Sequence, residues 1–189
     1  MDYNDSTKHI LYFATVQPEM DKAFYAEADE QLKQIYLDYT AKRLSLINAG
    51  NTAAPEDIYD FDKKLSEKRL SPEEYYDVEK VNNLYFFEQI AKMFPDIDME
   101  SVLASSGLKK ENKILINILI NDVACSEEYA HLFTNENLNV LKTKAKLEVV
   151  NDLGDLLSSG LTEADNRFNQ DYKGIEGAYT DKELAIIFL

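Results

Sequence analysis

Glycine and proline are sparse in this chain, and their scarcity limits the folds that it can adopt. Its 189 residues contain six glycines and four prolines. Because these two residues mark most turns, so small a number favours long helices over many short strands. Apolar residues make up 45% of the chain, which is ordinary for a globular protein and too many for a disordered one. We therefore expect a folded and mainly helical protein.

Start and stop signals predict where the helices lie. The first strong helix is predicted from Pro18 to Ala49, because its apolar residues recur at helical spacing. A second is predicted from Ser71 to Phe94, between a Ser-Pro-Glu-Glu capping box and the proline that follows. Later helices are predicted from Asn135 to Ser158 and from Thr162 to Lys173, and a second capping box at Thr180 opens a last helix.

Two segments leave the choice between helix and strand open. Residues 9–16, HILYFATV, lack strict alternation, and we interpret them as a short helix or a buried extended arm. A helix is predicted from Lys109 to Ala124, but its run ILINILI could also be a strand, because isoleucine-rich segments suit sheets. The length of the segment and the spacing of its apolar residues favour the helix.

These segments together predict an all-α protein. We expect an irregular multi-helix bundle of six to nine helices, with one long helix in the N-terminal half. The stretch from Pro95 to Gly107 is the expected divide between two helical subdomains. The N-terminal subdomain would comprise residues 1–95 and the C-terminal one residues 96–189, although a single domain fits the sequence as well.

The charge balance argues against direct binding to nucleic acid, and the distribution of apolar residues argues against a membrane span. The chain has 35 acidic and 20 basic residues and a formal net charge of −15, which repels phosphate groups. No stretch approaches the roughly 20 apolar residues that span a bilayer. The first residues also lack the basic start of a secretory signal. These features predict a cytoplasmic location.

Few residues of the chain could carry catalytic chemistry. There is one cysteine, Cys125, and there are two histidines, His9 and His131, so disulfide frameworks and three-histidine metal centres are impossible. The H-E-x-x-H, G-x-S-x-G and phosphate-loop motifs are absent. Cys125 is expected to be a small buried apolar residue.

Glu128 and His131 are the weak candidates for a metal site. They are three positions apart, so on a helix they lie on one face and could share an ion. Di-iron helix bundles use this pair twice, whereas it occurs here once. We therefore expect an ordinary helix residue at His131, no metal site and no cofactor.

Acidic stretches and tyrosines predict a surface that binds another protein. The chain has 12 tyrosines and no tryptophan, and tyrosine is enriched at protein interfaces. Two stretches of the C-terminal half carry acids without bases and would attract a basic partner. The predicted contact residues are Glu127, Glu128, Glu136, Asp152, Asp155, Tyr75 and Tyr76.

From these features we predict an acidic protein-binding module, bacterial or phage in origin, that neutralises or sequesters a basic partner by occlusion. Immunity proteins and phage-encoded inhibitors act in this way, and the partner would be a nuclease or another nucleic-acid-binding protein. One alternative is a helical enzyme that uses carboxylates and a divalent metal, which is the less favoured interpretation. Another is a structural protein that self-associates through its apolar end, Ile186 to Leu189.

Overall fold

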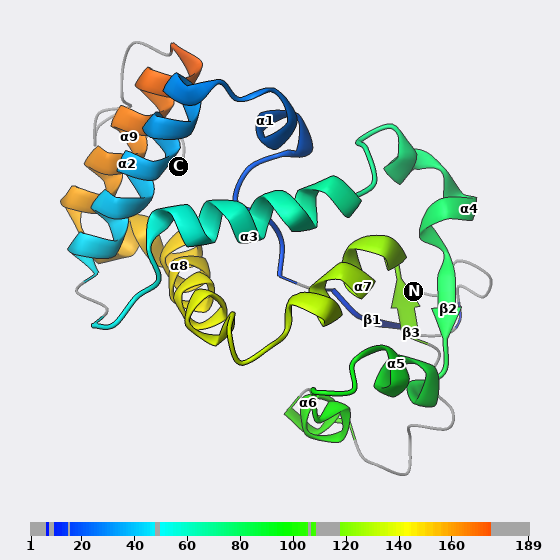
Figure 1. Cartoon of the computed structure of the whole chain (residues 1–189). Coiled ribbons are helices and arrows are strands. Elements are labelled where there is room, and N and C mark those ends of the chain that lie inside the picture. Colours follow the sequence, from blue (N-terminus) through cyan, green and yellow to red (C-terminus); the bar gives the residue numbers. More distant parts are fainter. Residues whose placement is uncertain are drawn as a thin grey trace. The chain divides into compact units, whose positions relative to one another are not determined.

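The computed structural model describes residues 7, 10–14, 16–47, 50–105, 107–108 and 118–174, without the side chains of 154–157. Within these residues the chain forms nine α-helices, one 3₁₀ helix and three short strands (Figure 1). The prediction of an irregular multi-helix bundle is therefore confirmed. The small sheet was not predicted, and it changes the interpretation of three segments.

The chain divides into two compact units, each built from two separate stretches of sequence. Unit 1 comprises Met1–Ala26 and Asp60–Leu138, and unit 2 comprises Glu27–Tyr59 and Asn139–Leu189. Residues 95 and 96 both lie in unit 1. The division into subdomains at that point stays a prediction.

Unit 1 combines a three-stranded sheet with short helices. Its strands have the order β1-β3-β2, in which β3 runs parallel to β1 and antiparallel to β2. The strands are β1 (Leu11–Tyr12), β2 (Asn83–Tyr85) and β3 (Ile118–Ile120). The helices are α1 (Lys22–Glu27), the later part of α3 (Pro55–Lys68), the 3₁₀ helix η1 (Glu74–Tyr76), α4 (Val78–Val81), α5 (Phe87–Met93), α6 (Met99–Ser105) and α7 (Val123–Leu132).

Strand β3 is the centre of unit 1. All three of its side chains are at most 1% exposed, so it is covered on both faces. Ile118 and Ile120 lie on one face and pack in a buried cluster with helical side chains, among them Phe87, Ile90 and Phe94. The sequence of a strand that is buried on both faces is a continuous apolar run, without the alternation of apolar and polar residues that a half-buried strand shows. The helix predicted from Lys109 to Ala124 is therefore wrong at β3, and residues 109–117 lie outside the described residues.

The helix predicted from Ser71 to Phe94 is wrong in its middle. Its capping box forms, because the Ser71 N–H donates to Glu74 Oε2 at 2.8 Å and the Glu74 N–H donates to Ser71 Oγ at 3.3 Å. The helical turn that follows is short, however, and the chain extends at Asn83 to pair with β3. Pairing with a distant strand overrides the local helical spacing here.

Near the N-terminus, Leu11–Tyr12 form β1, so the helical interpretation of this segment is wrong. The extended interpretation is correct, but the segment is not fully buried, because Tyr12 is 47% exposed. The helix predicted from Pro18 is interrupted at Asp29. Asp29 Oδ1 accepts a hydrogen bond from the Leu32 N–H at 2.9 Å and begins a new helix. Such local bonds let aspartate end one helix and cap the next.

Unit 2 contains three long helices and the start of α3. They are α2 (Glu30–Leu46), α8 (Leu138–Leu157) and α9 (Ser159–Lys173). Helices α2 and α9 pack side by side, as Figure 1 shows. Buried aromatic and aliphatic side chains fill the unit, and they include Tyr36, Leu37, Ile58, Leu147 and Leu161. The helix predicted around Thr180 and the apolar end from Ile186 lie outside the described residues.

Candidate functional site

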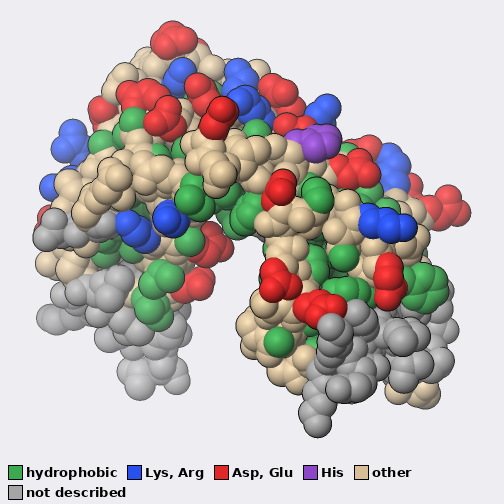
Figure 2. Space-filling model, turned by 60° about the horizontal axis from the view of Figure 1, so that its bottom comes forward, with side chains coloured by type: hydrophobic (Ala, Val, Ile, Leu, Met, Phe, Trp, Pro, Cys, Tyr) green, Lys and Arg blue, Asp and Glu red, His purple; other side chains and the backbone are tan. Residues whose placement is uncertain are grey.

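Five of the predicted contact residues lie in unit 1. Tyr76, in η1, is 88% exposed, and Glu127 and Glu136 are exposed in and after α7. Glu128 is partly buried in α7, and Tyr75 is partly buried in η1. On the face drawn in Figure 2, acidic side chains are interspersed with basic and hydrophobic ones.

The remaining two predicted contact residues belong to unit 2. Asp152 is exposed on α8, and Asp155 lies in the same helix with its side chain outside the described residues. The seven predicted residues are thus distributed over two units. Whether they contact a partner stays a prediction.

Glu128 and His131 share helix α7, as predicted, but no third ligand joins them. In the described part of the chain, no group of three or more His, Cys, Asp or Glu side chains could hold a metal ion. A protein zinc site requires at least three such ligands. The described residues therefore do not fit a catalytic zinc ion.

Asp122 forms a polar centre that the sequence analysis missed. Its Oδ1 accepts from the Cys125 N–H at 3.1 Å and caps α7. Its Oδ2 accepts from the Leu70 N–H at 2.8 Å and from the Tyr75 hydroxyl at 3.0 Å. Burial and the charge of Asp122 raise the pKa of the Tyr75 hydroxyl. Tyr75 is thus a structural donor within unit 1.

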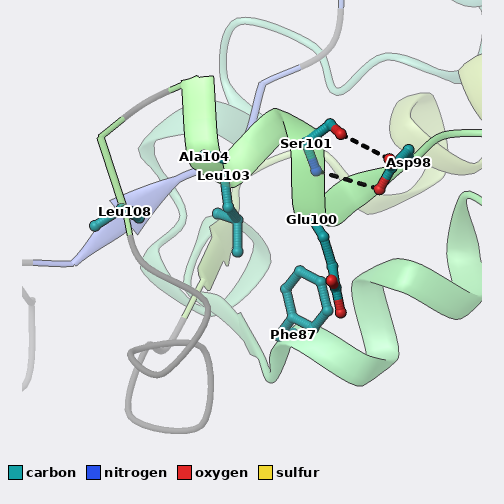
Figure 3. Close-up of a pocket in the computed structure, with 7 residues that line it drawn as sticks. All are labelled: Phe87, Asp98, Glu100, Ser101, Leu103, Ala104 and Leu108. Atoms are coloured by element: carbon teal, nitrogen blue, oxygen red, sulfur yellow. Dashed lines mark hydrogen bonds between the residues drawn. The ribbon is translucent and has the colours of Figure 1, made fainter.

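A pocket of about 290 Å³ opens beside α6 in unit 1 (Figure 3). Phe87, Leu103 and Leu108 give it apolar walls, and Glu100 extends along the ring of Phe87. Asp98 is held in place by Ser101, whose N–H and hydroxyl donate to it at 3.2 and 2.6 Å. Its volume lies at the lower end of the range of small-ligand pockets, and its lining combines apolar walls with two carboxylates. None of these residues was predicted to form a site.

Unit 2 has a groove of about 510 Å³ between α2 and α9. Tyr39 lies in it, donates its hydroxyl to Asp165 Oδ1 at 2.7 Å and stacks on Phe168 with ring centroids 4.2 Å apart. Behind Tyr39, the buried guanidinium of Arg43 lies 4.9 Å from the ring and donates to Asn151 Oδ1 and to the Leu147 carbonyl. This aromatic and cationic contact stabilises the packing of the three helices.

A match over almost the whole sequence identifies the family of this chain. Residues 1–184 match the model for the N-terminal part of peptidase family M13. This chain belongs to peptidase family M13. Its fold is similar to that of the Mycobacterium tuberculosis zinc metalloprotease Zmp1, seen by cryo-electron microscopy in the open state, with a TM-score of 0.79 and 18% identity.

That similarity covers 98% of this chain and 30% of the Zmp1 chain, so this M13 chain spans about a third of that protease. No curated protein matches the sequence. None of the helices in the described part of the chain is long and apolar enough to span a membrane.

Membership in family M13 overturns the predicted function. An inhibitor or immunity protein was inferred from acidity and from missing motifs, and the match over residues 1–184 shows that this inference is wrong. Net charge affects solubility and association but does not determine fold or family. It therefore could not distinguish an inhibitor from a part of a peptidase. The basic partner and the cytoplasmic location stay predictions.

Proposed function

We propose that this chain is a non-catalytic, peptide-binding part of an M13 peptidase, and that the catalytic zinc is held by residues outside these 189. The observation that carries the proposal is the family match over residues 1–184 in a sequence that has no H-E-x-x-H motif. The likeness to 30% of the Zmp1 chain supports it, because the remaining 70% has no counterpart here.

The positions of the two histidines support the non-catalytic role. A zinc peptidase of the H-E-x-x-H type holds its metal with two histidines one helical turn apart and uses the intervening glutamate as general base. The two histidines of this chain are His9 and His131, which are far apart in sequence. Glu128 and His131 have the E-x-x-H spacing, but the residue before Glu128 is Glu127 where the motif requires a histidine.

The surface of the chain supports the peptide-binding role. The pocket beside Phe87 combines apolar walls with the carboxylates of Asp98 and Glu100, and the groove beside Tyr39 combines aromatic rings with charged groups. Peptide recognition depends on such pockets for side chains together with backbone hydrogen bonds. The chain would then bind and orient a peptide that is cleaved elsewhere.

The test uses the 189-residue chain with zinc chloride and a fluorogenic peptide mixture. We expect peptide binding by fluorescence anisotropy, no cleavage, and no saturable heat of zinc binding by calorimetry. His131→Gln is the matched control, and its zinc titration is expected to equal that of the wild type. Cleavage that EDTA abolishes and zinc restores would show that the chain is itself an enzyme and would overturn the proposal.

A further inference from the structure

Strand β2 forms an edge of the sheet in unit 1. The strand order β1-β3-β2 leaves one side of β2 without a neighbour among the described strands (Figure 1). An edge strand presents backbone N–H and C=O groups to which another extended chain can be added.

The hydrogen-bond pattern identifies which backbone groups face outward. The Phe13 N–H donates to the Leu119 carbonyl at 3.0 Å, so the backbone groups of Leu119 face β1. The N–H and C=O of one strand residue point to the same side, and those of the next residue point to the opposite side. The groups of Ile118 and Ile120 therefore face β2. The backbone groups of their partners in β2, Tyr85 and Asn83, face β3 in turn. The N–H and C=O of Leu84, which lies between them, therefore face away from the sheet.

The surroundings of this edge are apolar and open. Leu84 is 37% exposed and Phe86 is 56% exposed, and both lie on the same face because they are two residues apart. The Phe86 N–H donates to Gln89 Oε1 at 2.8 Å, so outward pairing ends at Leu84.

The charges around β2 favour a basic ligand. Glu79 and Glu88 are exposed in α4 and α5, the helices directly before and after the strand in sequence, whereas Lys80 is paired with Glu74 at 2.6 Å. Glu127 lies close enough to act on Tyr85, since burial and then this charge raise the pKa of the Tyr85 hydroxyl. A lysine or arginine beside the apolar positions of a peptide would complement these acids.

We infer that the outer edge of β2 binds a basic, extended peptide, which joins the sheet as a further strand through the N–H and C=O of Leu84. The inference rests on the proposed peptide-binding function and names its site and ligand class. Apolar side chains of the peptide would contact Leu84 and Phe86, and its basic side chains would face Glu79, Glu88 and Glu127.

A proline substitution tests this inference directly. Proline has no N–H, and it is tolerated on an edge strand where that group faces away from the sheet. We expect Leu84→Pro to keep the wild-type circular dichroism spectrum and to weaken binding of a short fluorescein-labelled peptide of alternating valine and lysine by about tenfold. Leu84→Val keeps the N–H and an apolar side chain, and it is the matched control that should bind as the wild type does.

A second measurement does not depend on the folding of a variant. The same peptide with alternate backbone nitrogens methylated cannot pair with a strand edge, so the wild-type chain should bind it about tenfold more weakly. Equal affinity for both peptides, or for Leu84→Pro and the wild type, would overturn the inference. The proposed function would survive that result if another peptide still bound, and it would fall only if the chain cleaved peptides or bound none.

Discussion

Asp122 shows how one side chain holds separate segments of unit 1 together. Its carboxylate joins the segment after α3 at Leu70, the 3₁₀ helix at Tyr75 and the first turn of α7 at Cys125. Each of these bonds satisfies a backbone or hydroxyl donor that would otherwise be left in partly buried surroundings. The carboxylate therefore contributes more to stability than an ordinary helix cap does.

The substitution Asp122→Ala tests this difference. We expect it to lower the free energy of unfolding by about 2–4 kcal/mol, because one cap and two further bonds are lost. Asp77→Ala is the matched control, since Asp77 also caps a helix, where its Oδ1 accepts from the exposed Glu79 N–H at 3.0 Å. It should cost about 1 kcal/mol in a urea titration. Equal losses in the two variants would contradict the role given to Asp122.

The role of Tyr75 could not be predicted from the sequence, because it depends on a contact with Asp122 that only the folded chain creates. Composition marked it as a contact residue, yet its hydroxyl is bonded to a carboxylate 47 positions away. Tyr76 beside it is 88% exposed and remains available. Two adjacent tyrosines with nearly the same local sequence thus differ only through tertiary contact.

Among the elements, local start and stop signals were predicted better than the extent of whole helices. The capping box at Ser71 forms, and α9 ends at Lys173 as its sequence indicates. An extended chain was left open for the segments of β1 and β3, but the sheet was not predicted, because its strands are two or three residues long and depend on partners far away in sequence. In β3 the apolar residues serve both faces of a sheet, and such a run has no period that separates it from a helix.

The end of α9 gives a test of a local signal. Gly174 has φ of 64°, and its N–H donates to the Gln170 carbonyl at 3.0 Å. A Cβ at this position would meet no atom within 4 Å, so only the left-handed backbone opposes a side chain. Gly174→Ala should lower the free energy of unfolding by about 1–2 kcal/mol, and Gly174→Asn by less, because asparagine adopts this region more readily. Thermal melts in which both variants match the wild type would contradict this account.

For the whole molecule, the family could not be derived from residue chemistry. The features that define a metallopeptidase are a metal and its ligands, and these 189 residues contain no H-E-x-x-H motif that would reveal them. What remains is a helical fold with pockets and a sheet edge, and many binding proteins share that description. Only comparison over residues 1–184 separates these possibilities.

The net charge of −15 makes a prediction about the whole molecule. Repulsion among the acids opposes the compact state, and salt screens it. Raising NaCl from about 0.02 M to about 0.5 M should stabilise the chain by about 1 kcal/mol, or roughly 2–4 °C in melting temperature. The same titration near the isoelectric point of 4.5 is the control, because the net charge there is close to zero. A melting temperature that does not rise with salt at neutral pH would contradict the prediction.

The order of the strands also has a consequence for biosynthesis. Strand β1 carries Leu11, and its partner in β3 is Ile118, so β1 leaves the ribosome long before the strand that it pairs with. Until then the nascent chain must hold β1 and the apolar residues around it without their sheet partner. Exposed strands of this kind attract chaperones and neighbouring nascent chains. Translation through β3 is therefore the step at which unit 1 can first close its core, and pauses before that point would prolong the vulnerable state.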